Sequence, residues 1–192
     1  MENFYVLLNR MKVIERWSLM RRTSQENVME HAAQVAILGQ ALALIKNKKF
    51  GGNVNVDKVA ALALYHDAPE VVSGDLPTPI KYFNTDMVDA YAEIEKSILT
   101  QFNDLAPSFA KDEYKEYLMP DTNSEEYIIM KLADKLSAMI KCIEERVLGN
   151  HEFDVSYQRL TNSLNELKPK HPELEYFMDN YLAGFGEPSD MI

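Results

Sequence analysis

Apolar residues recur along this chain at intervals of three and four, the spacing that places side chains on one face of a helix. One such face comprises Val28, His31, Val35, Leu38 and Leu42. The stretches with this spacing are residues 4–14, 23–48, 87–102, 109–119, 124–148, 152–167 and 172–182. Residues 59–64 are apolar nearly all round, which is typical of a helix inside a core. The pattern predicts an all-α fold, a single-domain helical bundle.

Capping and proline signals give two of these helices their expected ends. Thr23 followed three residues later by Glu26 is a capping-box pattern, which predicts a helix from there to about Lys48. Asp57 is expected to cap the next helix. Pro69 is expected to end or bend that helix, because the residue before a proline is pushed out of the α region.

Residues 65–81, reading YHDAPEVVSGDLPTPIK, concentrate polar chemistry at the end of the core helix. His66 and Asp67 are metal-ligand types, and on a helix Glu70 would lie on the same side as both, where it can act as an acid or base. Alternatively, His66 and Asp67 form a hydrogen-bonded pair at a helix end and Glu70 is solvated. Gly74, Pro77 and Pro79 then predict a turn over residues 74–79, which carries Asp75 and Thr78 at a pocket mouth.

Two polar residues on other helices have an open role. His31 points inward, as either a core residue or a ligand. Asp134 lies off the apolar stripe of its helix, among small and apolar neighbours. It can therefore approach another helix closely, or form an ordinary surface ion pair with Lys131, Lys135 or Lys141.

Composition and charge narrow the possible partners. The 192 residues fit one domain, residues 1–192. The formal charge of −10 argues against a nucleic acid or an anionic membrane as partner. An anionic substrate would need local cations, and the main concentration in the sequence is a candidate phosphate-facing edge made of Arg10, Lys12, Arg16, Arg21 and Arg22.

The single cysteine, Cys142, excludes an internal disulfide and fits a reducing compartment. Its apolar neighbours favour a packed thiol over a nucleophile. The first residues lack the pattern of a signal peptide, and the apolar stretch at 32–45 is short for a membrane span and is interrupted by Gln34 and Gln40. We therefore expect a cytoplasmic protein.

Several common catalytic patterns are absent from the sequence. No histidine follows a glutamate by three residues, and neither His-Glu-x-x-His nor Gly-x-Ser-x-Gly occurs. One cysteine is too few for a structural zinc site. What remains is an inward histidine, an adjacent His-Asp pair and a later aspartate.

In this order His31, His66-Asp67 and Asp134 resemble the ligand set of the HD-domain phosphohydrolases, over roughly residues 10–150. More narrowly, several segments are similar to the bacterial 5′-deoxynucleotidases of that superfamily, the YfbR-like family. They are Arg16-Trp17, ENVMEH ending at His31, KNKKFGGNVN at 46–55, YHDAPEVVSGDLPTPIKYFN at 65–84 and KLADKLSAMIKCIEE at 131–145.

The resemblance implies an enzyme that removes phosphate from deoxyribonucleoside 5′-monophosphates, giving the deoxyribonucleoside and inorganic phosphate. It implies His31, His66, Asp67 and Asp134 as metal ligands. Two imidazoles and two carboxylates suit a divalent transition metal such as Co, Mn, Zn, Fe, Ni or Cu. Such a metal would polarise the phosphoryl group and acidify water, and the slowness of the uncatalysed reaction makes a metal-free site implausible.

The resemblance also assigns roles to residues beside the metal. Glu70 would be the general acid/base, and the planar fork of Arg16 would hold the phosphate. Trp17, which could also be a core or lid aromatic, would crowd the position of a ribose 2′-hydroxyl, and Asp75 would accept from the 3′-hydroxyl. The residues expected to contact substrate are Arg16, Trp17, Asp67, Asp75, Leu76, Pro77, Thr78 and Asp134.

Two alternatives remain open at this point. One is an HD phosphohydrolase that acts on another nucleotide, a triphosphate or a cyclic nucleotide, and the other is a non-catalytic helical dimer that senses a nucleotide. Glu70 beside the ligands argues against the sensor, because binding alone needs no acid or base. Apolar faces beyond what one bundle needs, together with the dimeric state described for relatives, favour a homodimer.

Overall fold

The computed structural model describes residues 3–187, and within that range the elements are helices, with one isolated bridge between Glu15 and Asn27. The all-α fold predicted from the sequence is confirmed. The α-helices are α1 (Phe4–Leu8), α2 (Val28–Lys49), α3 (Val56–Tyr65), α4 (Glu70–Ser73), α5 (Thr78–Lys81), α6 (Thr85–Leu105), α7 (Lys111–Leu118), α8 (Glu125–Val147), α9 (Asp154–Leu167) and α10 (Pro172–Tyr181). Short 3₁₀ helices span Asn9–Val13, Ser108–Ala110, His151–Phe153, Lys168–Lys170 and Leu182–Gly186.

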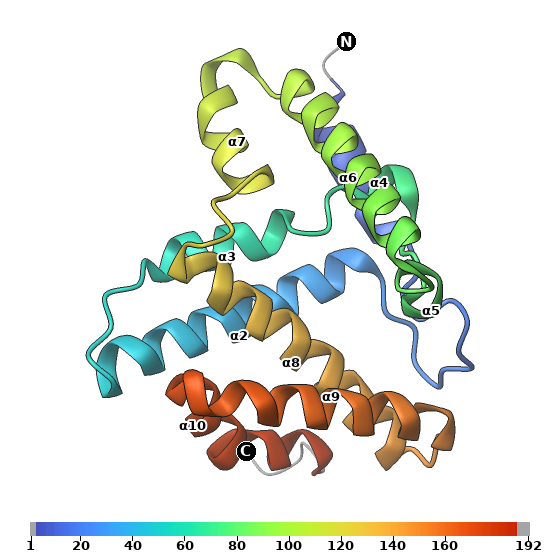
Figure 1. The fold of residues 1–192 in the computed structure, drawn as a ribbon, viewed down its shortest axis with the longest axis vertical. Coiled ribbons are helices and arrows are strands. Elements are labelled where there is room, and N and C mark those ends of the chain that lie inside the picture. The colour runs from blue at the N-terminus through green and yellow to red at the C-terminus, as the bar shows by residue number, and fades with distance from the viewer. Residues whose placement is uncertain (1–2, 188–192) are drawn as a thin grey trace.

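Helix α2 is the centre of the arrangement (Figure 1) and packs against α3, α8 and α10, while α9 packs on α8. The buried apolar side chains form two clusters, and α2 contributes to both. Val28 and Ala32 belong to the cluster that includes residues of α1, α6 and α7, whereas Val35 begins the larger cluster with α3, α8 and α10. His31 therefore lies on α2 where the two clusters meet.

The chain from α3 to α4 makes the same transition between clusters. Ala63 belongs to the larger cluster and Ala68 to the smaller one. Helix α3 ends at Tyr65, so His66 and Asp67 lie in the turn before α4. The prediction that both lie on a helix is wrong. Both histidines thus occupy the junction of the two clusters, far apart in sequence.

Two predicted helix starts are wrong by a few residues. Helix α2 begins after Asn27, whose side chain accepts hydrogen bonds from the backbone of Met29 and Glu30, and the Glu30 side chain completes the capping box. The Thr23–Glu26 pair has the same spacing but caps nothing. Asn55, two residues before Asp57, caps α3.

Proline and glycine shape the segment after His66 largely as predicted. Pro69 precedes α4, which confirms that it ends the earlier helix, and Gly74 ends α4 with φ of +71°. The turn predicted for residues 74–79 is shorter, because α5 already begins at Thr78. Asp75 lies in the remaining turn.

Helix α2 is also the one helix, among the described residues, that is long and apolar enough to cross a membrane by length and composition alone. Its 22 residues extend beyond the apolar stretch at 32–45 considered from the sequence. Half of its most apolar window is buried inside the protein. This is the behaviour expected of a core helix.

Candidate active site

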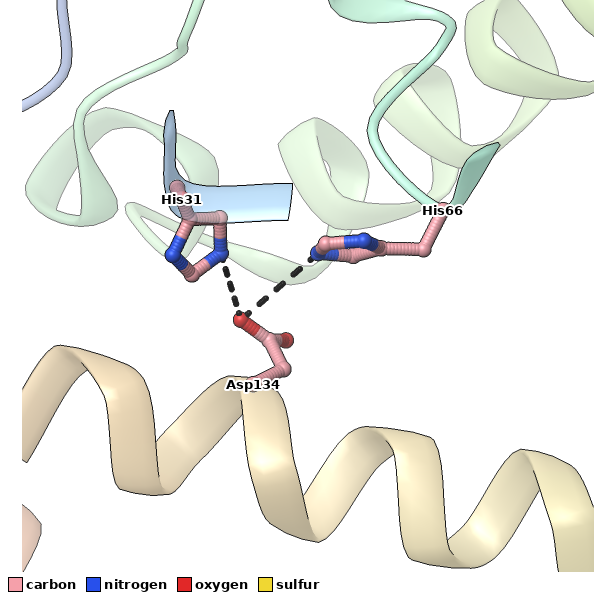
Figure 2. Close-up of side chains that lie close together, drawn as sticks. All are labelled: His31, His66 and Asp134. Carbon is pink, nitrogen blue, oxygen red and sulfur yellow. Dashed lines mark hydrogen bonds and ion pairs between the residues drawn. The ribbon is translucent and has the colours of Figure 1, made fainter. Parts of the chain in front are cut away.

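The side chains of His31, His66 and Asp134, from three parts of the chain, meet at the junction of the apolar clusters (Figure 2). Asp67 lies beside the two histidines. The Nε2 atom of His31 on α2 lies 3.1 Å from Oδ1 of Asp134 on α8, and Nε2 of His66 lies 3.8 Å from the same oxygen. Oδ2 of Asp67 lies 3.1 Å from Nε2 of His66 and 3.6 Å from Nε2 of His31. All four predicted ligand residues are therefore close together.

The second nitrogen of each imidazole fixes which nitrogen faces the cluster. Nδ1 of His66 lies 2.7 Å from the carbonyl oxygen of Ala63, which can only accept, so this nitrogen donates. Nδ1 of His31 lies 3.0 Å from Oγ of Ser137, and that hydroxyl gives its one proton to Gln34 at 2.5 Å. Nδ1 of His31 therefore donates too. Both rings present Nε2 to the carboxylates, as metal-ligating histidines do.

This arrangement fits a divalent transition metal. Because Nδ1 carries the ring proton in both histidines, the lone pair of each Nε2 atom faces a carboxylate. The lone pair and the carboxylate repel each other unless a proton or a metal cation lies between them. Nε2 of His66 is buried, and although it lies 3.1 Å from Asp67, no described residue gives it a hydrogen bond of good geometry. A buried polar atom of this kind needs an explanation. Mixed nitrogen and oxygen donors suit a divalent first-row metal.

The histidines and the carboxylates of the cluster shift each other's pKa values. Burial lowers the pKa of His66, but Asp67 and Asp134 outweigh burial and raise it to about 10. Burial raises the pKa of Asp134, but its contacts with His31 and His66 and the charge of Lys131 outweigh burial and hold it well below its usual range. The carboxylate thus stays ionised. A divalent cation among these groups competes with the proton on His66, as metal binding to imidazole generally does.

A cavity of about 550 Å³ opens beside the cluster. The two histidines do not line it, but Asp67 and Asp134, which contact them, do. The cluster therefore forms part of the cavity wall. Glu70 and all the residues predicted to contact substrate line this cavity, namely Arg16, Trp17, Asp67, Asp75, Leu76, Pro77, Thr78 and Asp134.

Arg16 is the one cation of the predicted basic edge that lines the cavity. Its Nη1 atom lies 3.5 Å from Oδ2 of Asp67, beside the histidines. Arg21 instead binds Glu152 at the surface and Arg22 binds Glu15, so only Arg16 of the candidate phosphate-facing edge reaches the cavity. The other cations that line the cavity come from later elements and are Lys81, Lys131, Lys135 and Arg159.

Glu70 is the first residue of α4. Its Oε2 atom is buried and has no hydrogen-bond partner among residues 3–187. Burial first, and then the negative charges of Asp67 and Asp75, raise the pKa of Glu70 to about 9. The side chain faces the cavity with a free oxygen that can take up or release a proton.

Trp17 also lines the cavity, from the loop before α2. Its backbone N–H donates to Oδ2 of Asp75 at 3.2 Å, and its indole N–H donates to Oε2 of Glu26 at 2.6 Å. The indole ring packs against the buried Phe153, with ring centroids 5.3 Å apart. Trp17 is thus an ordered part of the cavity wall.

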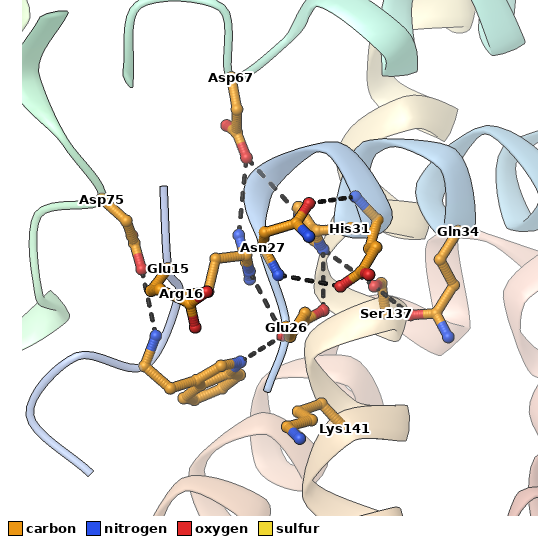
Figure 3. A network of polar contacts seen from close by, with 12 residues as sticks. Glu15, Arg16, Glu26, Asn27, His31, Gln34, Asp67, Asp75, Ser137 and Lys141 are labelled. Atoms are coloured by element: carbon orange, nitrogen blue, oxygen red, sulfur yellow. Dashed lines mark hydrogen bonds and ion pairs between the residues drawn. The ribbon is translucent and has the colours of Figure 1, made fainter. Parts of the chain in front are cut away.

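The sequence reasoning missed the residues behind the cavity wall (Figure 3). Gln34 and Ser137 lie three residues after His31 and Asp134, so helical spacing could have found them. The sequence pattern assigns Glu26 to a helix cap, whereas its side chain contacts Trp17 and Arg16. No local pattern predicts these contacts. Lys131 binds Asp134 at 2.5 Å, so the predicted ion pair exists alongside the histidine contacts.

Comparison with known proteins gives the fold and the family. A crystal structure of an HD-domain phosphohydrolase from Listeria innocua matches with a TM-score of 0.83 at 23% identity, covering 95% of this chain and 88% of that one. The HD phosphohydrolase of cyanophage S-2L, solved with dA and one catalytic Zn²⁺ ion, matches with a TM-score of 0.69 at 23% identity, over 93% and 96%. The fold is the HD-domain fold.

Sequence comparison is more specific. The 5′-deoxynucleotidase VV1113 of Vibrio vulnificus is 45% identical over 191 residues, which is 99% of this chain and 97% of the relative. The family model described as 5′-deoxynucleotidase YfbR-like matches residues 3–185. The chain belongs to the YfbR-like family of 5′-deoxynucleotidases.

Proposed function

We propose that this protein is a metal-dependent phosphohydrolase that converts deoxyribonucleoside 5′-monophosphates into the deoxyribonucleoside and inorganic phosphate. The observation that carries the proposal is a His/Asp cluster in the wall of a cavity that also contains Arg16, Trp17 and Glu70. A relative with 45% identity over nearly the whole chain is named a 5′-deoxynucleotidase.

His31, His66, Asp67 and Asp134 would hold the metal, a divalent transition metal such as Co, Mn, Zn, Fe, Ni or Cu. The directed Nε2 atoms and the ionised carboxylates support this assignment. When bound, the metal supplies Lewis-acid chemistry, polarising the phosphoryl group and acidifying water. A structural neighbour with one catalytic Zn²⁺ is consistent with a metal in this fold.

Arg16 and Glu70 would act on the phosphate and on the proton. Arg16 is anchored by Asp67 and offers a planar fork that matches phosphate oxygens. Hydrolysis requires a proton to leave the attacking water and another to reach the departing 5′-oxygen. The free Oε2 atom of Glu70 is suited to both transfers.

The sugar would lie against Trp17 and the segment from Asp75 to Thr78, which includes Leu76 and Pro77. The indole would occupy the space that a ribose 2′-hydroxyl needs. Asp75 would accept a hydrogen bond from the 3′-hydroxyl with an oxygen not used by Trp17. Deoxyribose selectivity is then steric.

The test is phosphate release from a deoxynucleoside and a ribonucleoside monophosphate, with Mn²⁺ or Co²⁺ added. Glu70→Gln should lose about 10²-fold or more in kcat while retaining metal, because a missing acid/base removes a term of that size. Glu116→Gln is a matched control, since this carboxylate pairs with Lys58 away from the cavity. Full activity of Glu70→Gln would contradict the assignment.

One observation favours a different substrate of the same enzyme class. Four cations besides Arg16 line the cavity, more than a single phosphate needs, namely Lys81, Lys131, Lys135 and Arg159. Deoxynucleoside triphosphates and cyclic nucleotides therefore belong in the same assay. Preferential turnover of either would replace the monophosphate proposal, and nucleotide binding without any turnover would favour the sensor.

We further propose that residues 1–192 act as one HD-type domain, in the cytoplasm and as a homodimer. The two apolar clusters share α2, which supports one folding unit. Cys142 is buried and unpaired, as a reducing compartment allows. Phe83 and Phe109 are 80% and 82% exposed, which supports an apolar contact with a second copy. Light scattering would measure a molar mass to compare with 22.0 kDa for one chain.

A further inference from the structure

Trp17 has an unusual backbone conformation. Among the described residues it is the one non-glycine residue with positive φ, at +60°. L-residues rarely adopt this region, because Cβ then crowds the following carbonyl, and they remain there only where the surroundings hold them. Such strain is typical of functional sites, so the contacts that hold Trp17 are informative.

Hydrogen bonds hold the backbone on both sides of this residue. The N–H of Arg16 donates to the carbonyl of Glu26 at 2.9 Å, and the N–H of Met20 donates to the carbonyl of Trp17 at 3.0 Å. The N–H of Trp17 itself donates to Asp75. None of these bonds restrains the rotation of the indole about its side-chain torsions.

The orientation of the indole depends on the side chain of Glu26 (Figure 3). Oε2 of Glu26 accepts the indole N–H at 2.6 Å, and the carboxylate is only 12% exposed. A short bond to an ionised acceptor is among the stronger hydrogen bonds in proteins. The ring also packs on Phe153, and Cζ of Arg16 lies 5.9 Å from its centroid, but neither contact is a hydrogen bond.

Glu26 also lies near Arg16, but Arg16 has a second anchor. Oε2 of Glu26 is 3.5 Å from Nε of Arg16, while Nη1 of Arg16 is 3.5 Å from Asp67. Without Glu26, Arg16 would therefore still have Asp67 as an ion-pair partner. The indole would lose its hydrogen bond. Glu26 itself is not among the residues that line the cavity.

We infer that Glu26 is a positioning residue that sets sugar selectivity, by fixing the indole of Trp17 where it excludes a ribose 2′-hydroxyl. This rests on the proposed function. Removing Glu26 frees the ring while the backbone of Trp17 stays in place. Ribonucleotides then gain access, and turnover of deoxynucleotides changes much less.

Trp17 is the sole tryptophan, so its fluorescence reports on the ring directly. We would compare Glu26→Ala and Glu26→Gln with the wild type, measuring the deoxy/ribo ratio of kcat/KM, quenching of Trp17 by acrylamide, and bound metal. Glu15→Gln is the control, because Glu15 lies in the same loop and binds Arg22 instead of the indole.

Glu26→Ala should lower the deoxy/ribo ratio about tenfold or more, the effect of losing a hydrogen bond to a charged group. Glu26→Gln should lower it less, since its amide oxygen can still accept the indole N–H. Acrylamide quenching should rise in both variants, more in Glu26→Ala than in Glu26→Gln. The control should match the wild type in ratio and in quenching.

A double variant tests whether Glu26 acts through the indole. In Trp17→Phe the N–H is absent, so adding Glu26→Ala should change the ratio little further. An equal change in both backgrounds, or an unchanged ratio in Glu26→Ala and Glu26→Gln, overturns the inference. A fall in deoxy and ribo turnover together would assign Glu26 to Arg16 or to metal retention, which also overturns it.

Failure of the proposed function would look different. If the wild type releases no phosphate from any nucleoside monophosphate, the proposed function and its selectivity are both wrong, whatever the quenching. If the wild type prefers deoxynucleotides and Glu26→Ala keeps that preference, the function stands and only the role of Glu26 is wrong.

Discussion

Glu145 is a fully buried carboxylate near the end of α8, and we expect its removal to destabilise the loop that leads to Trp17. It accepts hydrogen bonds from the backbone N–H of Thr23 at 2.8 Å, from the hydroxyl of Thr23 at 2.7 Å and from Asn150 at 2.8 Å. It also binds Lys141 at 2.6 Å, and Lys141 in turn binds Ser24. These contacts attach the loop to α8.

The expected loss of unfolding free energy depends on which charged group each substitution leaves buried without a partner. Glu145→Ala leaves the amine of Lys141, which is 3% exposed, without its counter-ion. Breaking a buried pair costs about 3–5 kcal/mol. Because Lys141 keeps its bonds to Ser24, we expect the lower end, about 3 kcal/mol. The double variant Lys141→Met with Glu145→Leu should recover at least half, since no unpaired charge remains.

The effect also depends on pH. Burial raises the pKa of Glu145, but hydrogen bonds from Lys141 and Thr23 outweigh burial and hold it well below the usual range. A carboxyl with a lower pKa in the folded state stabilises the protein above its unfolded pKa of about 4.3 and loses this effect as pH falls further. The difference in unfolding free energy between wild type and Glu145→Gln should therefore narrow from pH 7 to pH 3.

Urea denaturation at several pH values measures both effects, with the slope checked for two-state behaviour. A cost below about 1 kcal/mol for Glu145→Ala would refute the reasoning, because that is the range of a solvated surface pair. So would a gap between wild type and Glu145→Gln that stays constant down to pH 3.

Trp17→Ala should lower the deoxy/ribo ratio of kcat/KM, and an unchanged ratio would exclude the steric explanation of selectivity. Asp134→Asn should reduce bound metal, measured by elemental analysis, whereas Asp154→Asn at a surface pair should keep it. Gly39→Ala places a Cβ 2.8 Å from Cγ1 of Val59 and should destabilise the contact between α2 and α3 by about 1 kcal/mol net of helix propensity, measured by thermal unfolding. Adding Val59→Ala should restore part of that loss, and no restoration would show that the contact is not the cause.

Local patterns drew attention to the four residues that the structure brings together, and the family resemblance predicted a shared role for them. Helical spacing placed His31 on the buried face of α2, and an adjacent His-Asp pair needs no tertiary contact to be noticed. The backbone conformation at His66 was harder to predict from the sequence, because α3 ends one residue before it. The pair still reaches the cluster because the turn is held by Pro69 and by its own hydrogen bonds.

The loop before α2 could not be predicted from local pattern. Thr23–Glu26 and Asn27–Glu30 have the same spacing, and both match a capping box. Distant residues decide between them, because Glu145 takes the donors of Thr23 and the indole of Trp17 takes the carboxylate of Glu26.

The charge of the cavity resolves a conflict raised by the composition. A chain with a net charge of −10 repels an anionic substrate at long range. Inside the cavity, however, five cations face four carboxylates, and two of the carboxylates contact the histidine cluster. A divalent cation held there would make the local balance clearly positive, suited to a dianionic phosphate. A phosphate bound in the cavity would be nearer to this charge than to the surface acids, whose effect is screened beyond roughly 8–10 Å at physiological salt. A metal in this cluster would thus help to bind the phosphate as well as to cleave it.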